Sequence, residues 1–426
     1  MQKPFEWDSY SDQPYQLKEK AYKKRMRKKE LSSLLQTLGI TLFTLPFSLV
    51  MMPFIKRKKI DSRTFFSLGV DFQRYPQKTH QFIEELGVEH ILLRIKLWEM
   101  DTLPELQKFL SYHKEKTVTL KILQDREHIE NKDLLKKDFN TLFETLQDVV
   151  TYFEIGSTIN RAKWGFFSVR EYLAFFQVAY QLKKEKFPDI QLLGSGVIDF
   201  EFHFTAHTLF NFCKCHYDAT AALLYVDRRG APENTQLGFS LIDKIALLST
   251  MVWLSPKSKQ KLHITETNWP LSNTAPYAPT SEHECVSEKE YTNYMLRYYF
   301  LAFASQQVDS VSWHQLIASG YGLVDAREEL RKREAFQAYK FMLQTFQKAQ
   351  FLRLDIKRGY YILQIWVDEQ LIQIHWSLQS STLKNENYFQ AFDKLGHKLE
   401  DEFITIDGAP VYLFITQAAP KHINCI

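Results

Sequence analysis

Ionisable and aromatic side chains stand at the ends of several short apolar runs in this chain. Glu266 directly follows the run LHIT, Arg94 lies within HILLRIKL, and Tyr225 lies at the end of ATAALLYV. A carboxylate can attack an electrophilic carbon or transfer a proton, and an arginine and a tyrosine can hold its charge and orientation. Trp313 and His314 close the run DSVSWH, and an aromatic face can stack on a sugar ring. If these runs are parallel strands, the side chains meet at one edge of a sheet and form a site.

The element expected to position these groups is a strand followed by a helix, repeated eight times. Near-continuous apolar runs of about 4–8 residues are typical of strands buried on both faces of a parallel sheet. The expected strands are 64–70, 90–97, 117–123, 151–155, 190–195, 219–226, 262–265 and 309–314. Amphipathic stretches at helical spacing lie between them and after the last one. Eight units over residues 64–348 match the length of a (β/α)₈ barrel, typically about 250 residues, and predict an α/β fold of that type.

The pattern changes after residue 348. Residues 351–378 and 403–416 alternate apolar and polar side chains, with glycine and aspartate at the expected turns. Alternation with a period of two is typical of half-buried antiparallel strands. Residues 349–426 are therefore expected to form a small antiparallel β domain behind the barrel.

These features together resemble clan A glycoside hydrolases, the retaining enzymes built on (β/α)₈ barrels. In that clan the seventh strand ends in the nucleophilic glutamate, and Glu266 in HITETNWP stands at that place. Arg94 resembles the clan's second-strand arginine near the nucleophile, Tyr225 the sixth-strand tyrosine that orients it, and Trp313 the eighth-strand tryptophan beneath the sugar. The resemblance covers residues 64 to about 348 and implies a glycan as the ligand.

The fourth strand departs from the clan's pattern. Its motif, Glu-x-x-Asn-Glu-x-Asn, carries the acid/base glutamate, and aligning Glu154 and Asn160 with it puts Thr158 at that position. Retaining hydrolysis needs two carboxyl groups about 5–5.5 Å apart, and threonine has no titratable proton near neutral pH. The second carboxyl group would have to come from Glu154, Asp227 or Glu233. Glu154 lies four residues too early, roughly 13 Å along an extended strand, so the loop residues Asp227 and Glu233 are sterically easier candidates.

Further ligand contacts are expected at the same end of the barrel. Arg228 and Arg229, in the loop DRRGAPEN, would suit an anionic sugar, a phosphate or a carboxylate, although this loop could also be a solvated turn. Asn160 and Trp269 are additional candidates, with core packing as the alternative for any single tryptophan. His314 is expected to point outward, because it follows Trp313 in strand alternation.

Composition narrows the class of protein. Hydrophobic residues make up 45% of the chain and charged residues 24%, which is typical of a folded globular protein. The net charge of +4 is unevenly divided, since residues 1–63 carry 14 Lys and Arg against 6 Asp and Glu. The remainder shows no basic stripe with interleaved aromatics, so nucleic-acid binding is not expected. The four cysteines show no metal-ligand spacing, and neither a metal nor another cofactor is expected.

Residues 31–55 form a run of 25 residues without a charge, which follows a basic arm over residues 1–30. About 20 apolar residues span a bilayer core, and basic flanks favour an anionic membrane surface, so a membrane segment is predicted. The upstream basic cluster favours a single span with the N-terminus inside, but the cluster after residue 55 also prefers the cytoplasmic side. Pro46 could instead break the segment into an interfacial or re-entrant hairpin, and a buried core helix is the remaining alternative.

The sequence as a whole predicts a protein associated with a bacterial-type inner membrane whose barrel acts on, or binds, a cell-envelope or exported polysaccharide. If the barrel is active, Glu266 attacks the anomeric carbon in a retaining mechanism with an altered acid/base. The alternative is a catalytically inactive glycan-binding protein that works with polysaccharide-assembly proteins, and a third possibility is a structural membrane scaffold. The side of the membrane that carries the barrel stays open.

Overall fold

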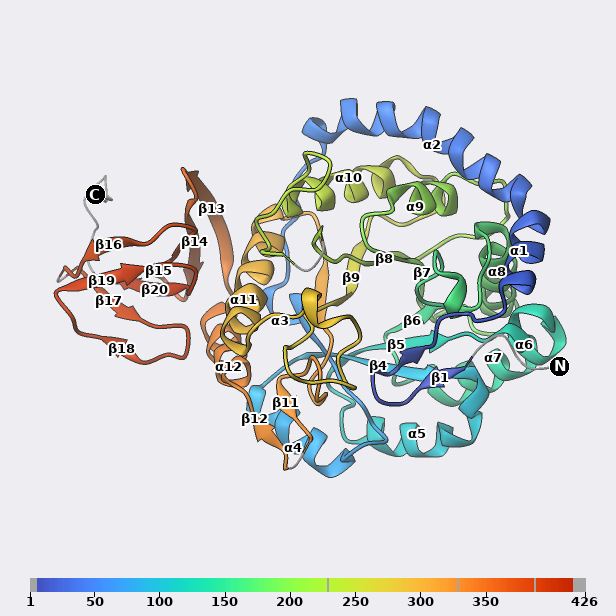
Figure 1. Ribbon diagram of the computed structural model, residues 1–426, viewed down its shortest axis with the longest axis horizontal. Coiled ribbons are helices and arrows are strands. Elements are labelled where there is room, and N and C mark those ends of the chain that lie inside the picture. Colours follow the sequence, from blue (N-terminus) through green and yellow to red (C-terminus); the bar gives the residue numbers. More distant parts are fainter. Residues whose placement is uncertain (1–5, 228–229, 328, 387, 417–426) are drawn as a thin grey trace.

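A computed structural model describes residues 6–227, 230–327, 329–386 and 388–416 of the chain. Eight parallel strands close into a barrel, in the order β10-β3-β4-β5-β6-β7-β8-β9 (Figure 1). The strands are β3 (Phe66–Gly69), β4 (His90–Lys96), β5 (Thr117–Leu123), β6 (Tyr152–Ile155), β7 (Leu192–Ile198), β8 (Ala219–Leu223), β9 (Leu262–Thr267) and β10 (Ser310–Trp313). Their side chains are almost all buried, because one face fills the barrel and the other packs against helices. The predicted (β/α)₈ barrel is confirmed.

Helices surround the barrel on the outside (Figure 1). They are α3 (Ser62–Phe65), α4 (Pro76–Leu86), α5 (Leu103–Ser111), α6 (Arg126–Glu130), α7 (Lys132–Leu146), α8 (Val169–Glu185), α9 (Phe202–Leu209), α10 (Leu241–Leu254), α11 (Glu288–Ser305) and α12 (Glu334–Phe346). Local sequence sets several of their ends. Ser168 caps α8 by accepting a hydrogen bond from the Glu171 amide, and Ser287 begins α11 in a capping box with Glu290. Gly87 ends α4 in the left-handed conformation that glycine adopts without strain.

Strand register decides which side chains share a level inside the barrel. Arg94 of β4 is the register partner of Lys121 of β5, which in turn is the partner of Glu154 of β6. A bulge in β9 inserts one residue, because Ile264 pairs with Val311 while Thr267 pairs with Trp313. The extra residue interrupts the alternation of inward and outward side chains, so Thr265 and Glu266 both reach groups inside the barrel.

The C-terminal part of the chain forms an antiparallel β domain beside α11 and α12 (Figure 1). Its main sheet has the order β13-β14-β15-β20-β17-β18, and β16 and β19 form a separate pair. These strands are β13 (Gln350–Lys357), β14 (Tyr360–Val367), β15 (Gln370–Ser377), β16 (Ser381–Lys384), β17 (Phe389–Phe392), β18 (Lys398–Leu399), β19 (Phe403–Ile406) and β20 (Val411–Ile415). A short pair, β11 (Val324–Asp325) and β12 (Arg331–Lys332), follows the last barrel strand. The predicted β domain is confirmed.

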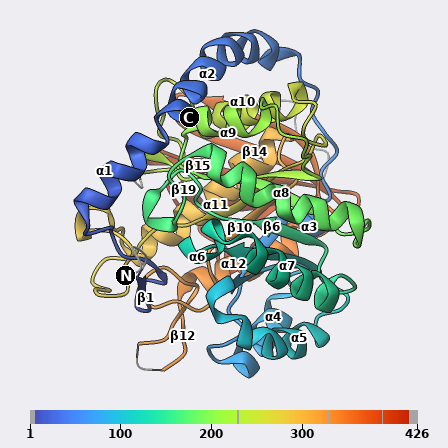
Figure 2. The same cartoon turned by 90° about the vertical axis from the view of Figure 1, so that its right-hand side faces the viewer.

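The N-terminal residues lie across the barrel rather than apart from it. Strands β1 (Trp7–Asp8) and β2 (Gln13–Pro14) pair as a small hairpin near the barrel mouth, and the name N-terminal hairpin is used below for residues 6–15. Helix α1 (Lys20–Lys29) leads from it to α2 (Leu31–Met51), which runs along the outside of α9 and α10 (Figures 1 and 2). By length and composition, Leu31–Phe54 is the only helical stretch in the described part of the chain that could cross a membrane. Most of its large apolar side chains are exposed, so it is not a buried core helix.

Candidate active site

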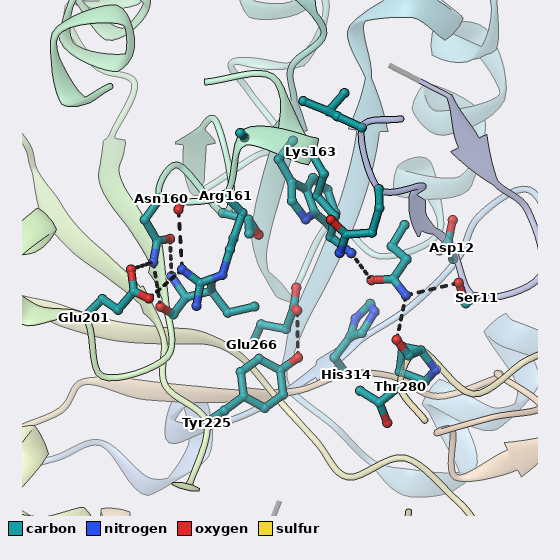
Figure 3. A pocket seen from close by; sticks show the side chains of 18 of the residues that line it. Ser11, Asp12, Asn160, Arg161, Lys163, Glu201, Tyr225, Glu266, Thr280 and His314 are labelled. Atoms are coloured by element: carbon teal, nitrogen blue, oxygen red, sulfur yellow. Dashed lines mark hydrogen bonds and ion pairs between the residues drawn. The ribbon is translucent and has the colours of Figure 1, made fainter. Parts of the chain in front are cut away.

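A cavity of about 530 Å³ opens at the end of the barrel where the strands reach their C-termini. Active sites of (β/α)₈ barrel enzymes lie at this end, and the volume is in the range of small-ligand sites. In Figure 3, Asn160 and Glu201 stand on one side of the cavity, Ser11 and Asp12 on the other, and Glu266 between them. The charged side chains among its described lining residues are Asp12, Glu201, Glu266, Lys23, Arg27, Arg94, Arg161 and Lys163.

Glu266, at the end of β9, has both carboxylate oxygens bonded. The Tyr225 hydroxyl donates to Oε1 at 2.8 Å, and Lys121 Nζ donates to Oε2 at 3.2 Å. Burial alone would raise the pKa of Glu266, but the neighbouring positive charges, Lys121 foremost, and the Tyr225 hydrogen bond outweigh burial and lower the pKa to about 2. Glu266 is therefore an ionised carboxylate of fixed orientation, which is the state that a nucleophile at an anomeric carbon needs.

A second carboxylate, that of Glu154, lies beneath Glu266 and contacts the same lysine, Lys121. Lys121 Nζ is 3.7 Å from Glu154 Oε2, and both side chains are completely buried. The Thr265 hydroxyl donates to Glu154 Oε1 at 3.0 Å. Burial raises the pKa of Glu154 to about 7, against the opposing effect of the Lys121 ammonium. A carboxyl group that is partly protonated at neutral pH could serve as an acid, but Glu154 does not line the cavity and cannot reach a leaving group there.

Lys121 is a residue that the sequence analysis missed. It lies inside the apolar run TVTLKIL, and a charged side chain within a strand buried on both faces is rare unless it has a charged partner. This unusual position of a lysine was the feature by which the sequence could have revealed Lys121. The lysine is important because it holds the charge of Glu266 from beneath and links it to Glu154.

Thr158 lies on the β6 side of the cavity. Thr158 is buried in the cavity wall and has a φ of 52°, a left-handed conformation that is unusual for a β-branched residue. Its hydroxyl has the Ser157 hydroxyl as a neighbour at 3.4 Å. Strained backbone of this kind persists where surrounding structure enforces it, often at functional sites. The loop thus places Thr158 at the cavity, but the side chain offers no titratable proton.

Asn160 and Arg161 form a polar wall with Glu201. Asn160 Nδ2 donates to Glu201 Oε2 at 2.8 Å, and Arg161 Nη1 donates to Glu201 Oε1 at 2.7 Å (Figure 3). Arg161 Nη2 also donates to Asp199 at 2.6 Å. Asn160 further bonds the backbone of Ile198 through both ends of its amide. These bonds give the wall a fixed shape and balance the charge of Arg161.

The N-terminal hairpin closes one side of the cavity. Asp12, near its tip, forms an ion pair with Arg94 of β4. Arg94 therefore contacts Asp12 directly, whereas it influences Glu266 only electrostatically. Gln13 bonds both flanking loops, since its amide donates to the Pro279 carbonyl at 2.8 Å and its carbonyl accepts from Lys163 Nζ at 2.7 Å.

An aromatic contact fixes the base of the same hairpin. The Trp7 ring lies 5.4 Å from the ring of Trp98 and 5.8 Å from that of Trp164, and Lys96 Nζ lies 4.9 Å from its centroid. Trp98 and Trp164 follow the second and fourth barrel strands, so the hairpin is held between the loops after β4 and β6. No feature of the sequence alone predicted that the N-terminal hairpin closes one side of the cavity.

The structure does not bring the other proposed acids into the cavity. Glu233 is 2% exposed, accepts a hydrogen bond from Trp376 Nε1 at 2.9 Å and pairs with Arg297 at 3.2 Å, so it belongs to the contact between the barrel and the β domain. Asp227 does not line the cavity either, and its carboxylate acts electrostatically on Lys244 of α10. Neither placement fits an acid that faces Glu266. Arg228 and Arg229 lie outside the described residues.

The two expected stacking tryptophans are core residues. Trp313 and Trp269 are fully buried, stack on each other at 5.8 Å, and pack against the tyrosines of α11. The expectation that they contact a sugar is corrected, because Trp313 points out of the barrel into the helical layer. Alternation then turns His314 inward, and it lines the cavity, against the expectation that it points outward. Burial lowers the pKa of His314 to about 3, so this histidine is neutral at ordinary pH.

Comparison with known proteins identifies the fold and no closer relationship. No protein-family model and no curated protein matches the sequence. A family 39 glycoside hydrolase from Bacteroides cellulosilyticus WH2 superposes with a TM-score of 0.64 and 13% identity, covering 84% of this chain and 82% of that one. A family 39 β-xylosidase from Caulobacter crescentus gives 0.57 and 11% over 85% and 98% of the two chains. A family 30 endoxylanase from Clostridium papyrosolvens C71 gives 0.55 and 8% over 84% and 97%.

These structures are clan A glycoside hydrolases, and the chain shares their fold, an eight-stranded parallel barrel with helices and a C-terminal antiparallel sheet. At such low identity the likeness establishes the fold alone. What the cavity does must be argued from its own side chains.

Proposed function

We propose that the barrel mouth binds a saccharide and that Glu266 faces its anomeric carbon, as the nucleophile of a retaining glycoside hydrolase does. The observation that carries this proposal is an ionised carboxylate, fixed by Tyr225 and Lys121, at the mouth of a barrel shared with clan A glycoside hydrolases. The polysaccharide would be a cell-envelope or exported one. Because similar folds include a β-xylosidase and an endoxylanase, xylosides are the first compounds to test.

We further propose that Thr158 takes the place of the acid/base glutamate. Nucleophilic attack by Glu266 would then be supported, whereas protonation of the leaving group would not. Attack by Glu266 on a sugar with a leaving group such as dinitrophenolate needs no proton donor, whereas a sugar alkoxide must be protonated as it departs. The protein should therefore react with activated glycosides and leave ordinary glycosidic bonds intact.

The test is covalent labelling of the full-length protein with dinitrophenyl 2-deoxy-2-fluoro-xyloside and the corresponding glucoside. Intact mass should show one added fluoroglycosyl group, and peptide mapping should locate it on Glu266. Glu266→Gln is the inactive control, and Asp12→Asn runs in parallel to loosen the N-terminal hairpin over the cavity. If neither the wild type nor Asp12→Asn gains mass, the nucleophilic role is refuted.

The alternative function is a glycan-binding protein without turnover, which works among polysaccharide-assembly proteins. Thr158 favours it, because among the described lining residues the carboxyl groups other than Glu266 are Asp12 and Glu201, and these are already held by Arg94 and Arg161. Saccharide binding that persists in Glu266→Gln, together with the absence of covalent labelling, would select this alternative. A scaffold would bind no saccharide.

We also propose that α2 attaches the protein to a membrane, in a bacterial-type inner membrane, while lying along the barrel. Its inner face is small and polar, since Ser33, Thr37 and Ser48 are buried and the Thr37 hydroxyl bonds His207 Nδ1 of α9 at 2.7 Å. Its outer face is apolar, with Leu42 and Phe43 exposed by 72% and 79%. An apolar face with basic residues before and after it is typical of helices that lie in the interface of an anionic bilayer.

Vesicle flotation can test this attachment. The full-length protein should float with phosphatidylglycerol-containing vesicles and less well with pure phosphatidylcholine. Leu42→Glu with Phe43→Glu should abolish flotation, whereas a matched pair on the β domain, Leu352→Glu with Ile356→Glu, should not. Equal flotation of both variants would refute the role of α2.

A further inference from the structure

The Asp12–Arg94 pair places a carboxylate of the protein's own chain inside the candidate saccharide site. The side chains of Asp12 and Arg94 are only 8% and 13% exposed, and Asp12 is the only carboxylate within 4.0 Å of this guanidinium among residues 6–227, 230–327, 329–386 and 388–416. Burial alone would raise the pKa of Asp12, but the Arg94 guanidinium, followed by Lys96, outweighs burial and lowers the pKa. The pair is therefore fully ionised at neutral pH.

A second cation of the cavity also depends on the N-terminal hairpin. Lys163 Nζ donates to Gln13 Oε1 at 2.7 Å, and the carboxylate that supports its charge electrostatically is Asp8 of the same hairpin. Burial lowers the pKa of Lys163 to about 8, so this side chain stays mainly protonated at neutral pH. Arg161 differs, because Glu201 and Asp199 of the barrel neutralise it.

Contacts with the barrel, rather than its own strands, hold the hairpin in place. Its two strands are two residues long each, and isolated two-stranded hairpins are at best marginally stable in water. Its departure would not disturb Glu266, which Lys121 and Tyr225 hold from inside the barrel. It would leave Arg94 and Lys163 facing the cavity without the hairpin groups that now bond them.

We propose that the N-terminal hairpin is a displaceable occupant of this site, and that the saccharide which displaces it carries a carboxylate that takes the place of Asp12 on Arg94. This inference rests on the proposed saccharide-binding function. A guanidinium presents a fork that matches a carboxylate with two parallel hydrogen bonds. A buried cation that loses its partner is strongly unfavourable, so a neutral sugar would have to break the ion pair without replacing it. The ligand class is therefore a saccharide that contains a uronic acid.

The experiment compares a glucuronic-acid-containing xylo-oligosaccharide with the same oligosaccharide lacking the acid, on the full-length protein. Calorimetry measures affinity, and hydrogen exchange measured by mass spectrometry reports whether the peptide over residues 6–15 is docked. The acidic ligand should raise deuterium uptake in that peptide, and the neutral ligand should not. Asp12→Asn should raise uptake without ligand and bind the acidic ligand about tenfold more tightly, because less binding energy is used to expel the hairpin. Glu6→Gln, which removes an exposed carboxylate of the same hairpin, is the matched control.

Equal affinity for the two oligosaccharides, or unchanged uptake in residues 6–15 on binding, overturns this inference and leaves the proposed function intact. Failure of wild type and Asp12→Asn to bind any saccharide overturns the proposed function itself. The two failures are thus distinguishable.

A different observation, on the outer wall of the barrel, concerns a cluster that the cavity does not use. His80 and Glu84 are one turn apart on α4, and His113 follows α5; one ligand atom from each lies within 4.8 Å of the others. His113 is 2% exposed, and neither of its ring nitrogens has a hydrogen-bond partner; His80 Nδ1 also lacks one. Unpaired buried polar atoms are rare in native proteins and often mark an ion or water.

We infer that His80, Glu84 and His113 form a site for one divalent cation of the zinc type, which ties α4 to α5. Two imidazoles and a carboxylate are a donor set that zinc accepts, with water as the fourth ligand. Glu84 now has Lys116 Nζ at 3.4 Å and His113 Nδ1 at 4.0 Å from the same oxygen, so a bound ion would compete with this lysine. Tetrahedral zinc with ligands at about 2.0–2.2 Å needs donor atoms about 3.3 Å apart, so the three side chains must close from separations of up to 4.8 Å.

The test is Zn²⁺ titration of protein that has first been treated with EDTA. One equivalent should bind and raise the unfolding temperature, and EDTA should reverse the rise. His113→Gln and Glu84→Gln should each lower the affinity at least tenfold, whereas His397→Gln on the β domain should not; Glu84 is half-exposed, so its variant should fold even if the buried substitution does not. Absence of stoichiometric binding, or equal binding in all three variants, refutes the site.

Discussion

The β9 and β6 sides of the barrel mouth hold their central side chains in opposite ways. On the β9 side, Glu266 has two donors and an ionised carboxylate. On the β6 side, Thr158 has only a hydroxyl neighbour, and the carboxyl group with a raised pKa, Glu154, is sealed beneath the cavity. Under the proposed function, charge at an anomeric carbon and proton delivery to a leaving group would thus depend on different sides of one site. Four substitutions test this difference between the two sides.

Lys121→Met should have the largest effect, because it removes the cation that Glu154 and Glu266 share. Breaking a buried ion pair by deleting one partner costs about 3–5 kcal/mol of unfolding free energy. The Glu266 pKa should rise at the same time, and covalent labelling at neutral pH should fall. Chemical denaturation measures the stability, and the exposed pair Lys136–Glu185 provides a control in Lys136→Met, expected to lose less than about 0.5 kcal/mol. Equal losses of unfolding free energy in the two variants would show that the buried ion pairs of Lys121 stabilise the fold no more than an exposed pair does.

Glu154→Gln should change how stability depends on pH. The pKa of Glu154 is raised in the folded protein, so its contribution is fully present below the ordinary pKa of a glutamate and is lost as the pH rises through about 7. The wild type should therefore lose roughly 3 kcal/mol relative to Glu154→Gln between pH 4.5 and pH 8. Parallel denaturant titrations at the two pH values measure the difference. If the stability difference between wild type and Glu154→Gln is the same at both pH values, the raised pKa of Glu154 is refuted.

Tyr225→Phe should weaken the hold on the Glu266 charge without disturbing the barrel. A hydrogen bond to a charged group contributes about 1.5–3 kcal/mol, so the pKa of Glu266 should rise by about one to two units. The pH profile of covalent labelling would report the shift, with its acid limb moving to higher pH. Tyr112→Phe, on an exposed tyrosine, should leave the profile in place.

Thr158→Glu should have the smallest effect and the opposite sign. If the proposed function holds, placing a carboxyl group on the cavity wall should speed cleavage of a glycoside with a poor leaving group by about tenfold, less than the full 10²–10⁴ of a well-placed acid. Thr158→Gln has the same size and no titratable proton, so it isolates the contribution of proton transfer. No gain of Thr158→Glu over Thr158→Gln would mean that this position does not face the leaving group.

Sequence reasoning succeeded where a pattern is local and failed where a contact is long-range. The eight apolar runs predicted the barrel strands, because burial on both faces forces a continuous run. Glu266, Tyr225 and Arg94 were expected at one mouth, and they do lie there. The predicted directions of the Trp313 and His314 side chains were wrong. Which side chains of this strand point into the barrel depends on how the strand packs against α11, and the sequence of the strand alone does not specify this. The contact of Asp12 with Arg94, across 82 residues, had no local signature.

The contacts of Glu233 link the barrel to the β domain. This carboxylate of the barrel lies between Arg297 of α11 and the indole of Trp376, which itself stacks on Tyr361 at 4.9 Å and contacts Phe300 of the barrel. A truncation after residue 348 would take the indole donor away from Glu233 and open the aromatic surface of α11 to water. The excised barrel should therefore aggregate, and the β domain is an integral part of the folded body rather than a detachable appendage.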